Sequence, residues 1–264
     1  MRSNHRELKK RAWAANLEIA KHALAIYNFG NASAFDPEAG LVAIKPSGVA
    51  YQDLSVEDMV VLDLEGKIVE GRLKPSSDTR THLMLFREMR GLGGVVHTHS
   101  TYATGWAQAA TPIPILGTTH ADYLAEDVPC TQLMTAAAAA GDYEAETGRQ
   151  IVDCFRGRDP SRTPMVLVAG HGAFTWGKTP EEAVHHAVVL EEIARMAFVT
   201  RTIAPGAARL PEHLVRKHFE RKHGTDAYYG QRQEDRASRE ERPRRRAAAS
   251  TRRRPPRNGR PEEI

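Results

Sequence analysis

The sequence predicts an α/β domain in which helices cover both faces of a mixed sheet. Short β-branched apolar runs alternate along the chain with stretches of helical apolar spacing. The 264 residues are 41% hydrophobic and 27% charged, which is the usage of a globular protein with one sizeable core. There is no internal repeat and no linker before residue 232, so we expect residues 1–231 to form a single domain.

In the first part of the chain, apolar spacing over residues 8–26 predicts an amphipathic helix, and the run LVAIK at 41–45 predicts a strand. The polar residues at 55–58 predict a short turn of helix. The stretch MVVLDLEGKIVEG at 59–71 predicts a hairpin, because β-branched runs flank the Glu-Gly pair at 65–66, which suits a tight turn.

The later elements continue the alternation of helix and strand. We expect, in order, a helix at 81–89, a strand at 93–99, a helix from 103, a short strand at 113–116, a helix at 143–155 and a strand ending at 171. A long helix to about Thr202 should begin at Thr179, because this N-cap residue precedes Pro180 at the first helical position and Glu182 at the third.

Apolar runs and cysteines restrict the class of protein. No run approaches the roughly 20 apolar residues of a membrane span, and the charged N-terminus has no apolar signal-peptide core. We therefore expect a cytoplasmic protein. Cys130 and Cys154 are too few for a disulfide framework, and we expect neither to bind a metal.

The charge is unevenly distributed along the chain. Residues 232–264 hold twelve Arg and six acidic residues, a balance of +6, so the net charge of +4 leaves −2 for residues 1–231. This tail has almost no large apolar side chains to offset the entropy lost on ordering, which predicts disorder. An Arg-rich run without aromatic residues can bind nucleic acid or another polyanion only weakly, so we favour a solvated extension.

Two histidines two residues apart follow an apolar run in the segment GLGGVVHTHS. His97 and His99 would point to the same side of a strand and could bind one metal ion, with zinc the natural choice. Two hydrogen-bonded core histidines would explain the pattern equally well. His171 favours the metal, because it ends a second apolar strand at a glycine-flanked turn.

The segment KPSSDT opens the predicted helix at 81–89. Asp78 could supply an oxygen ligand, although the pattern alone favours a helix N-cap. Ser76 and Ser77, together with the free N–H groups of the helix N-terminus, form a candidate anion site, and a phosphate is the expected ligand.

Seven segments resemble, in order, those of the class II sugar-phosphate aldolase and epimerase family: KPSGV, KPSSDT, GGVVHTHS, GTTHADY, PCT, HGAFTWGK and RKHGTDAYYGQ. The resemblance extends from about residue 5 to Gln231. It implies an α/β/α sandwich with a central, mainly antiparallel sheet. It also implies a ring-shaped homotetramer with active sites at the subunit interfaces, one Zn²⁺ or another divalent metal per subunit, and a small sugar-phosphate substrate.

The closeness of the match implies epimerisation at C4 of a pentulose 5-phosphate. The hydrogen on C4 is not acidic, because the carbonyl lies two bonds away at C2. Cleavage of the C3–C4 bond is feasible if a metal acts as a Lewis acid on the C2 and C3 oxygens. The released aldehyde can then turn and be attacked on its other face, which requires a grip on the phosphate and an acid or base on each side of the aldehyde.

The resemblance also implies roles for individual residues. The implied metal ligands are Asp78, His97, His99 and His171. The implied substrate and phosphate pocket consists of Gly30, Asn31, Lys45, Ser47, Gly48, Ser76 and Ser77. Asp122, Tyr229 and His218 match acid/base residues contributed by a neighbouring subunit, although the sequence pattern alone would select none of them. The family usually has Trp where this chain has Phe29, a position that we expect outside the contact residues.

Three alternative functions are weighed against the same sequence features. A class II sugar-phosphate aldolase would release free products. A thiosugar-phosphate dehydratase would use similar histidines, but KPSSDT and AYYGQ fit it less well. A non-catalytic oligomeric scaffold with a polyanion-binding tail is disfavoured by the complete set of candidate site residues. The role of His120 is undecided, and the remaining histidines are expected at surface or satisfied core positions: His22, His82, His185, His186, His213 and His223.

Overall fold

The computed structural model describes residues 3–225 and 227 of the 264. Tyr229 and the Arg-rich segment 232–264 lie outside the described residues. The chain divides into one unit of residues Met1–Phe219 and a second of Glu220–Ile264. In the second unit, the described residues are the last turn of a helix and those just after it. The domain boundary expected after residue 231 stays a prediction.

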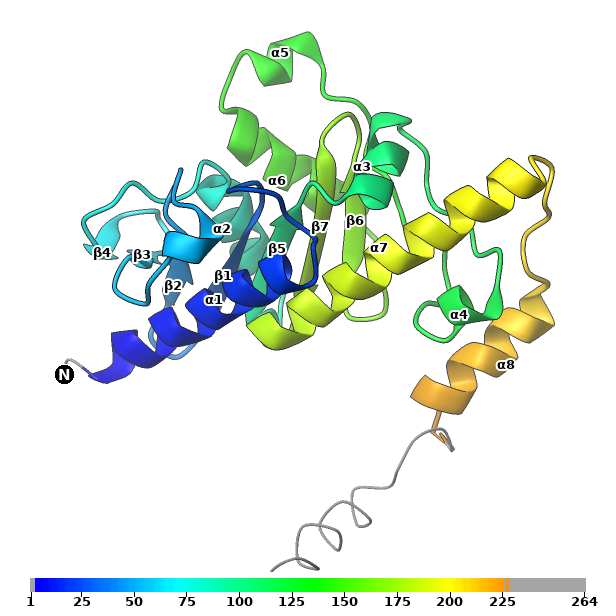
Figure 1. The fold of residues 1–264 in the computed structure, drawn as a ribbon, viewed down its shortest axis with the longest axis horizontal. Helices are drawn as coiled ribbons and strands as arrows, with labels where there is room; N and C mark the ends of the chain where they lie inside the picture. Colours follow the sequence, from blue (N-terminus) through cyan, green and yellow to red (C-terminus); the bar gives the residue numbers. More distant parts are fainter. Residues whose placement is uncertain (1–2, 226, 228–264) are drawn as a thin grey trace, which may run out of the picture. The chain divides into compact units, whose positions relative to one another are not determined.

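The seven strands of the described chain form one sheet in the order β4-β3-β2-β1-β5-β7-β6 (Figure 1). They are β1 (Asn31–Asp36), β2 (Leu41–Ile44), β3 (Val60–Asp63), β4 (Ile68–Glu70), β5 (Gly94–Thr98), β6 (Met165–Val168) and β7 (Gly172–Gly177). Every neighbouring pair is antiparallel. The antiparallel sheet implied by the family resemblance is confirmed, and the mixed sheet expected from the alternation of elements is wrong.

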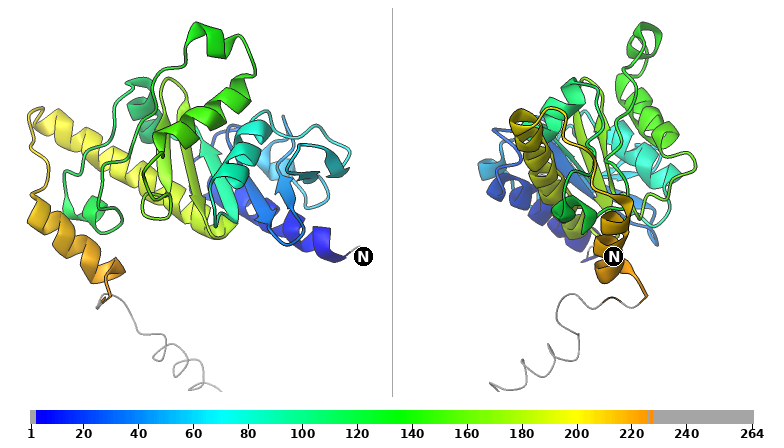
Figure 2. Two further views of the ribbon diagram at one scale, coloured as in Figure 1. Left: turned by 180° about the vertical axis from the view of Figure 1, so that it is seen from behind. Right: turned by 90° about the vertical axis from the view of Figure 1, so that its right-hand side faces the viewer.

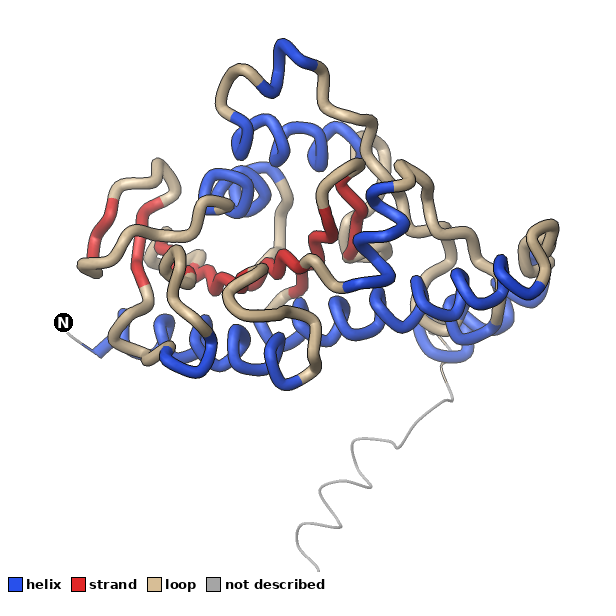
Figure 3. The backbone as a smooth tube through the Cα atoms, turned by 45° about the horizontal axis from the view of Figure 1, so that its top comes forward, coloured by secondary structure: helices blue, strands red, loops and turns tan. Residues whose placement is uncertain are grey.

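Helices cover both faces of this sheet. Figures 1 and 3 show α1 and α7 on one face and α2 and α6 on the other, and the right-hand view of Figure 2 shows the same layers end-on. The helices are α1 (Ser3–Lys21), η1 (Tyr51–Asp53), α2 (Thr79–Glu88), α3 (Thr101–Gln108), α4 (Thr118–Ala121), α5 (Ala136–Ala139), α6 (Tyr143–Cys154), α7 (Pro180–Ile203) and α8 (Glu212–His223). No helix among the described residues has both the length and the apolar content to cross a bilayer.

Alternate residues of β5 face opposite helix layers. Val95 belongs to the buried cluster that contains Leu85 of α2. Val96 belongs to the cluster that contains Ile19 of α1 and residues of α7. Because side chains alternate along a strand, His97 faces the same layer as Val95. The first metal-ligand candidate therefore lies on the α2 and α6 side of the sheet.

Patterns with caps and clear periodicity predicted their elements well. The hairpin of β3 and β4 is present, as are α2, α3 and α6 close to their expected bounds. The N-cap expected for α7 is also confirmed, because the Thr179 hydroxyl accepts a hydrogen bond from the Glu182 N–H at 3.2 Å. Pro180 occupies the first helical position, where its missing N–H costs nothing.

The sequence pattern did not predict β1 and β7, whose sequences NASAFD and GAFTWG contain few β-branched residues. Two glycines of the sheet have a packing reason. A Cβ on Gly177 of β7 would lie 2.7 Å from the Cβ of Glu182, and a Cβ on Gly94 of β5 would lie 2.4 Å from the Cα of Pro180. The start of α7 therefore lies directly against the sheet, which only small side chains allow.

Three expected elements differ in the structure. The first helix ends at Lys21 rather than near 26, because Ala23 is left-handed (φ 55°) and the Leu24 N–H bonds back to the Ile19 carbonyl. The expected strand at 113–116 is only an isolated bridge between Ile113 and Val128, since Pro114 has no N–H to donate. Residues 55–58 form a turn rather than a helix, and β3 begins two residues later.

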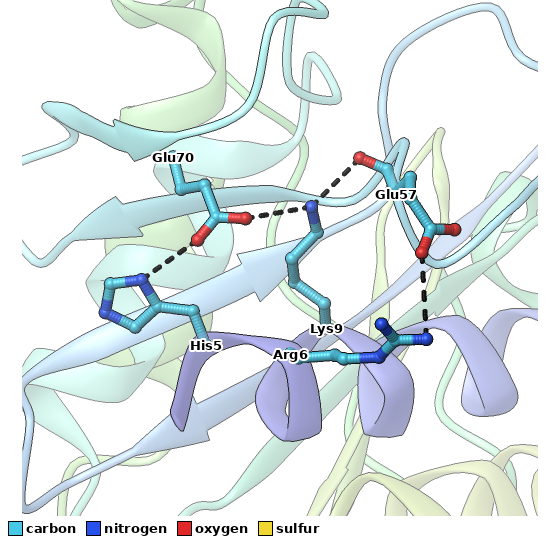
Figure 4. Close-up of polar contacts among 5 residues, drawn as sticks. All are labelled: His5, Arg6, Lys9, Glu57 and Glu70. Atoms are coloured by element: carbon cyan, nitrogen blue, oxygen red, sulfur yellow. Dashed lines mark hydrogen bonds and ion pairs between the residues drawn. The ribbon is translucent and has the colours of Figure 1, made fainter. Parts of the chain in front are cut away.

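A buried lysine ties α1 to the β3–β4 hairpin (Figure 4). Lys9 donates hydrogen bonds to the Glu57 carbonyl at 2.9 Å and to Glu70 Oε1 at 3.2 Å, and its side chain is only 8% exposed. His5 lies 3.0 Å from the other oxygen of Glu70, and the exposed Arg6 lies 4.0 Å from the Glu57 carboxylate. The Lys9 contacts fix the end of α1 against the edge of the sheet.

Candidate metal centre and active site

Two of the candidate ligands come from the end of β5. His97 is buried on the strand, and His99 follows it as a more exposed residue whose ring is still partly enclosed. Their Nε2 atoms lie 3.0 Å apart. The His97 Nδ1 lies 2.9 Å from the Ala173 carbonyl oxygen, which can only accept, so Nδ1 must carry the proton. The Nε2 lone pair of a neutral His97 therefore faces the other histidine.

The third histidine lies in the turn between β6 and β7. Gly170 is left-handed there (φ 73°), and His171 follows it. The ligand atoms of the three histidines all lie within 4.8 Å of one another. Gly172 is needed at this place because a Cβ would lie 2.8 Å from the Thr98 carbonyl oxygen and 3.3 Å from the His97 ring. The turn thus brings His171 close to the ligands of β5.

Burial keeps these imidazoles neutral at neutral pH. It lowers the pKa of His97 to about 3, against an opposing effect of the Asp78 carboxylate, and it also lowers the pKa values of His99 and His171. The His171 Nδ1 is buried and has no hydrogen-bond partner among the described residues. Three neutral imidazoles that converge in this way fit a divalent metal such as zinc, which takes nitrogen ligands.

Asp78 is used differently from the helix cap that the sequence pattern favours. It occupies the N-cap position of α2, but its carboxylate makes no cap hydrogen bond. Instead, Oδ2 accepts a hydrogen bond from the Asn31 amide at 2.6 Å and lies 3.4 Å from the Ser76 hydroxyl. Burial alone would raise the pKa of Asp78, but the nearby histidines, His97 first, and the Asn31 hydrogen bond lower it. The site therefore holds a partly buried carboxylate beside the three histidines.

One cavity of about 460 Å³ brings most of the predicted site residues together. The predicted residues that line it are Gly30, Asn31, Lys45, Ser47, Gly48, Ser76, Ser77, Asp78, His97, His99 and His171. Lys45 is 2% exposed, burial lowers its pKa, and its Nζ lies 3.4 Å from the Pro46 carbonyl oxygen. The roles of these residues stay predictions, but their common position is a property of the fold.

Three further residues line this cavity that the sequence pattern did not indicate. Asn28 and Pro46 were not considered, and Phe29, which we expected outside the contact residues, also lines it. Phe29 is 55% exposed, and its ring lies 6.5 Å from that of Tyr27 in an edge-on arrangement. The two aromatic residues are visible in the segment IYNFGN, but nothing in that pattern indicates that Phe29 lines the cavity.

The predicted acid/base residues lie elsewhere in the chain. Asp122 Oδ1 lies 3.0 Å from His218 Nδ1, and both side chains are largely buried. Neither is among the described residues that line the cavity. Tyr229 lies outside the described residues. The cavity of one chain and the Asp122–His218 pair are thus two separate groups.

His120 and His82 are both buried core histidines. His120 is 4% exposed, and burial lowers its pKa to about 4. It lines a second cavity of about 470 Å³ beside α7. His82, on α2, is fully buried and lies 2.7 Å from the Ser33 hydroxyl.

Comparisons with known proteins give one consistent answer. A family model described as Class II Aldolase and Adducin N-terminal domain matches residues 10–198. A protein named L-ribulose-5-phosphate 4-epimerase UlaF from Salmonella typhi is 52% identical over 226 residues, covering 86% of this chain and 99% of the relative. A protein of the same name from Salmonella choleraesuis is 51% identical, with the same coverage.

Solved structures agree on the fold. An L-fuculose 1-phosphate aldolase superposes with a TM-score of 0.69 at 25% identity, covering 81% of this chain and 95% of that one. An aldolase of the same name from Glaciozyma antarctica PI12 has a TM-score of 0.67 at 18% identity, covering 83% of this chain and 82% of that one, and shows the fold alone.

Proposed function

Because the chain belongs to the class II aldolase and adducin N-terminal domain family, we propose that it is a metal-dependent epimerase that converts L-ribulose 5-phosphate to D-xylulose 5-phosphate. The observation that carries this proposal is the 52% identity over 99% of the length of relatives named L-ribulose-5-phosphate 4-epimerase. The cavity supports it, since it combines three converging histidines, a partly buried carboxylate and a group of serines.

The metal would be held by His97, His99 and His171, with Asp78 as an oxygen ligand, and we propose zinc as the ion. When bound, it supplies Lewis-acid stabilisation of the negative charge that develops on the substrate oxygens as the C3–C4 bond breaks. The chain prepares for this role in two ways. The Ala173 carbonyl fixes the protonated nitrogen of His97, and Asn31 holds the Asp78 carboxylate in place.

The serine-lined side of the cavity would bind the phosphate. Ser47, Ser76 and Ser77 supply hydroxyl groups there, and the N-terminus of α2 begins directly after them. Lys45 lies in the same wall as a buried cation donor. A firm grip on the phosphate keeps the released aldehyde in the site while it turns to present its other face.

Proton transfer would come from a neighbouring subunit. We propose a homotetramer in which Asp122, His218 and Tyr229 of one chain face the cavity of another. One group removes the proton of the C4 hydroxyl as the C3–C4 bond breaks, and a group on the opposite side returns a proton to the new alkoxide when the bond reforms. The pairing of Asp122 with His218 away from their own cavity supports this arrangement.

Product analysis tests the proposal. Metal-loaded protein given L-ribulose 5-phosphate in D₂O should form D-xylulose 5-phosphate without deuterium at C4, because the C4–H bond is never broken. Accumulation of dihydroxyacetone and glycolaldehyde phosphate would instead identify an aldolase. Deuterium at C4 would refute bond cleavage and reclosure, and an absence of turnover would favour a scaffold. The metal-free protein is the matched control.

A further inference from the structure

We propose that Ser33 and His82 are positioning residues that hold Asp78 toward the metal centre, an inference that rests on the metal site of the proposed function. His82 lies one helical turn after Asp78 on α2, and Ser33 lies two residues after Asn31 on β1. Neither is among the described residues that line the cavity. Each must therefore act through a residue that does.

Two hydrogen bonds join the same faces of α2 and β1. Asn31 donates to Asp78 Oδ2 at 2.6 Å, and Ser33 Oγ lies 2.7 Å from His82 Nδ1. Residues two apart on a strand are separated by about 6.6 Å, and residues four apart on a helix by about 6 Å along the axis. The two contacts therefore have matched spacing along α2 and β1. The Asn31–Asp78 contact lies in the cavity wall, and the Ser33–His82 contact lies behind it.

The Ser33–His82 contact is fully buried. Ser33 and His82 are both 0% exposed, and the His82 Nε2 is buried without a hydrogen-bond partner among the described residues. A buried, half-satisfied imidazole is a poor choice for stability, because an apolar side chain of similar size would avoid that cost. The polar pair is better explained by the orientation that it imposes on α2.

His82 is also linked to the histidine ligands through one aromatic ring. Its ring lies edge-on to that of Phe174 at 6.0 Å, and Phe174 stacks on His97 at 4.2 Å with an interplanar angle of 19°. His82 thus contacts a residue that supports His97 and lies on the same helix face as Asp78. A change at His82 would affect both sides of the metal site.

These two contacts determine whether the Asp78 carboxylate caps α2 or faces the metal site. A carboxylate at the N-cap position normally accepts from the first N–H groups of its own helix. Asp78 makes no such bond here, because Asn31 holds it on the β1 side. If the hydrogen bond between Ser33 and His82 were lost, α2 could rotate relative to β1, and Asp78 could cap the helix instead.

Zinc affinity provides the test, measured by competition with a chromophoric zinc chelator at pH 7 together with the thermal unfolding midpoint. Ser33→Ala and His82→Leu should each weaken zinc binding by about 10- to 100-fold, as expected for loss of a contact behind the ligands. His82→Asn should recover part of the loss, because its amide can still reach the Ser33 hydroxyl. At saturating zinc, kcat should still fall, because Asp78 is no longer held toward the metal.

Thr81→Val is the matched control. The Thr81 hydroxyl donates to the Glu144 carbonyl at 2.7 Å, so it also anchors α2 through a partly buried hydrogen bond, but to α6 rather than to β1. We expect this variant to lose stability and keep its zinc affinity. If it loses as much zinc affinity as Ser33→Ala, the effect belongs to α2 in general and the inference is wrong.

The remaining outcomes separate this inference from the proposed function. If the wild-type protein binds no zinc or other divalent metal, the metal site itself is wrong and the inference falls with it. If the wild type binds zinc and both Ser33→Ala and His82→Leu bind it equally well, only the inference is overturned. Should His82→Leu fail to fold, the smaller change Ser33→Ala decides.

Discussion

At the residue scale, His97 shows how burial and a single carbonyl prepare a metal ligand. Its Nδ1 donates to the Ala173 oxygen, so the free lone pair is on Nε2. Burial lowers the pKa of the ring to about 3, so protons do not compete for that lone pair at neutral pH. The ligand is therefore oriented and unprotonated before any metal binds.

His97→Ala should abolish metal binding. The variant keeps His99 and His171, but it removes the most deeply buried of the three histidine ligands. We expect close to one equivalent of zinc per wild-type chain and much less in the variant, measured by elemental analysis after dialysis. Full metal occupancy in His97→Ala would refute the assignment of these ligands.

His120 should make the free energy of unfolding depend on pH. Burial lowers its pKa to about 4, whereas an unfolded chain has a histidine pKa near 6.5. Between these values the unfolded state binds more protons than the folded state, so stability should fall as the pH drops from 6.5 toward 4.

Urea unfolding of the metal-free protein at pH 7 and pH 5 measures this effect. The contribution of one such histidine over that interval is about 1–2 kcal/mol. His120→Asn should therefore lose less stability on acidification than the wild type does. An identical loss in both proteins would show that His120 does not contribute.

At the element scale, α2 connects the site with the rest of the core. It begins at the serines of the cavity, carries Asp78 at its N-cap position, and buries Leu83 and Leu85 against the sheet. Its hydrogen bonds run to β1 through His82 and to α6 through Thr81. The same element that supplies phosphate and metal contacts is thus fixed from two sides.

The stability of α1 packing, on the opposite face of the sheet from α2, should depend on Lys9 (Figure 4). Lys9→Met keeps the buried stem but removes the two hydrogen bonds to Glu57 and Glu70, one of them to a charged group. We expect a loss of about 1–2 kcal/mol in the free energy of unfolding by urea. Arg6→Met is the control on the same helix. Its ion pair is long and exposed, so it should change stability little, and an equal loss would count against the proposed tie.

At the scale of the whole molecule, periodic elements were predictable and small-residue strands were not. Helix α6 shows clear apolar spacing and α7 a clear N-cap, whereas β1 and β7 contain few β-branched residues, and Gly177 of β7 lies where the close approach of α7 leaves no room for a side chain. Such a reason exists only in three dimensions. The antiparallel order of the sheet followed from the family resemblance and not from the pattern of elements.

The candidate site, like the fold, was predictable from the sequence only in part. Strand spacing and a glycine turn indicated the three histidines, and the structure places them together. The use of Asp78 was ambiguous, because a helix cap and a carboxylate ligand have the same sequence pattern. The contact between Ser33 and His82 joins residues 49 positions apart, and it depends on how α2 lies on β1. No local pattern encodes that placement.

A single chain also separates the two groups of residues that the proposed reaction needs. The histidines and the serines share one cavity, while Asp122 pairs with His218 and does not line that cavity. If the proposed homotetramer forms, each active site combines the cavity of one chain with Asp122, His218 and Tyr229 of another. Two different inactive variants should then complement each other.

Mixing His97→Ala with Asp122→Asn tests this arrangement. Each pure oligomer should be nearly inactive, because the first lacks a metal ligand and the second lacks an acid/base group. Asparagine keeps the size of the side chain, so assembly should survive. Hetero-oligomers formed by refolding the two together should contain some interfaces in which an intact His97 of one chain meets an intact Asp122 of the next. Activity should therefore return to a sizeable fraction of wild type, and Tyr229→Phe should behave in the same way as Asp122→Asn. If mixed oligomers, verified by mass spectrometry, remain as inactive as their parents, these residues act within their own chain or have no part in the reaction.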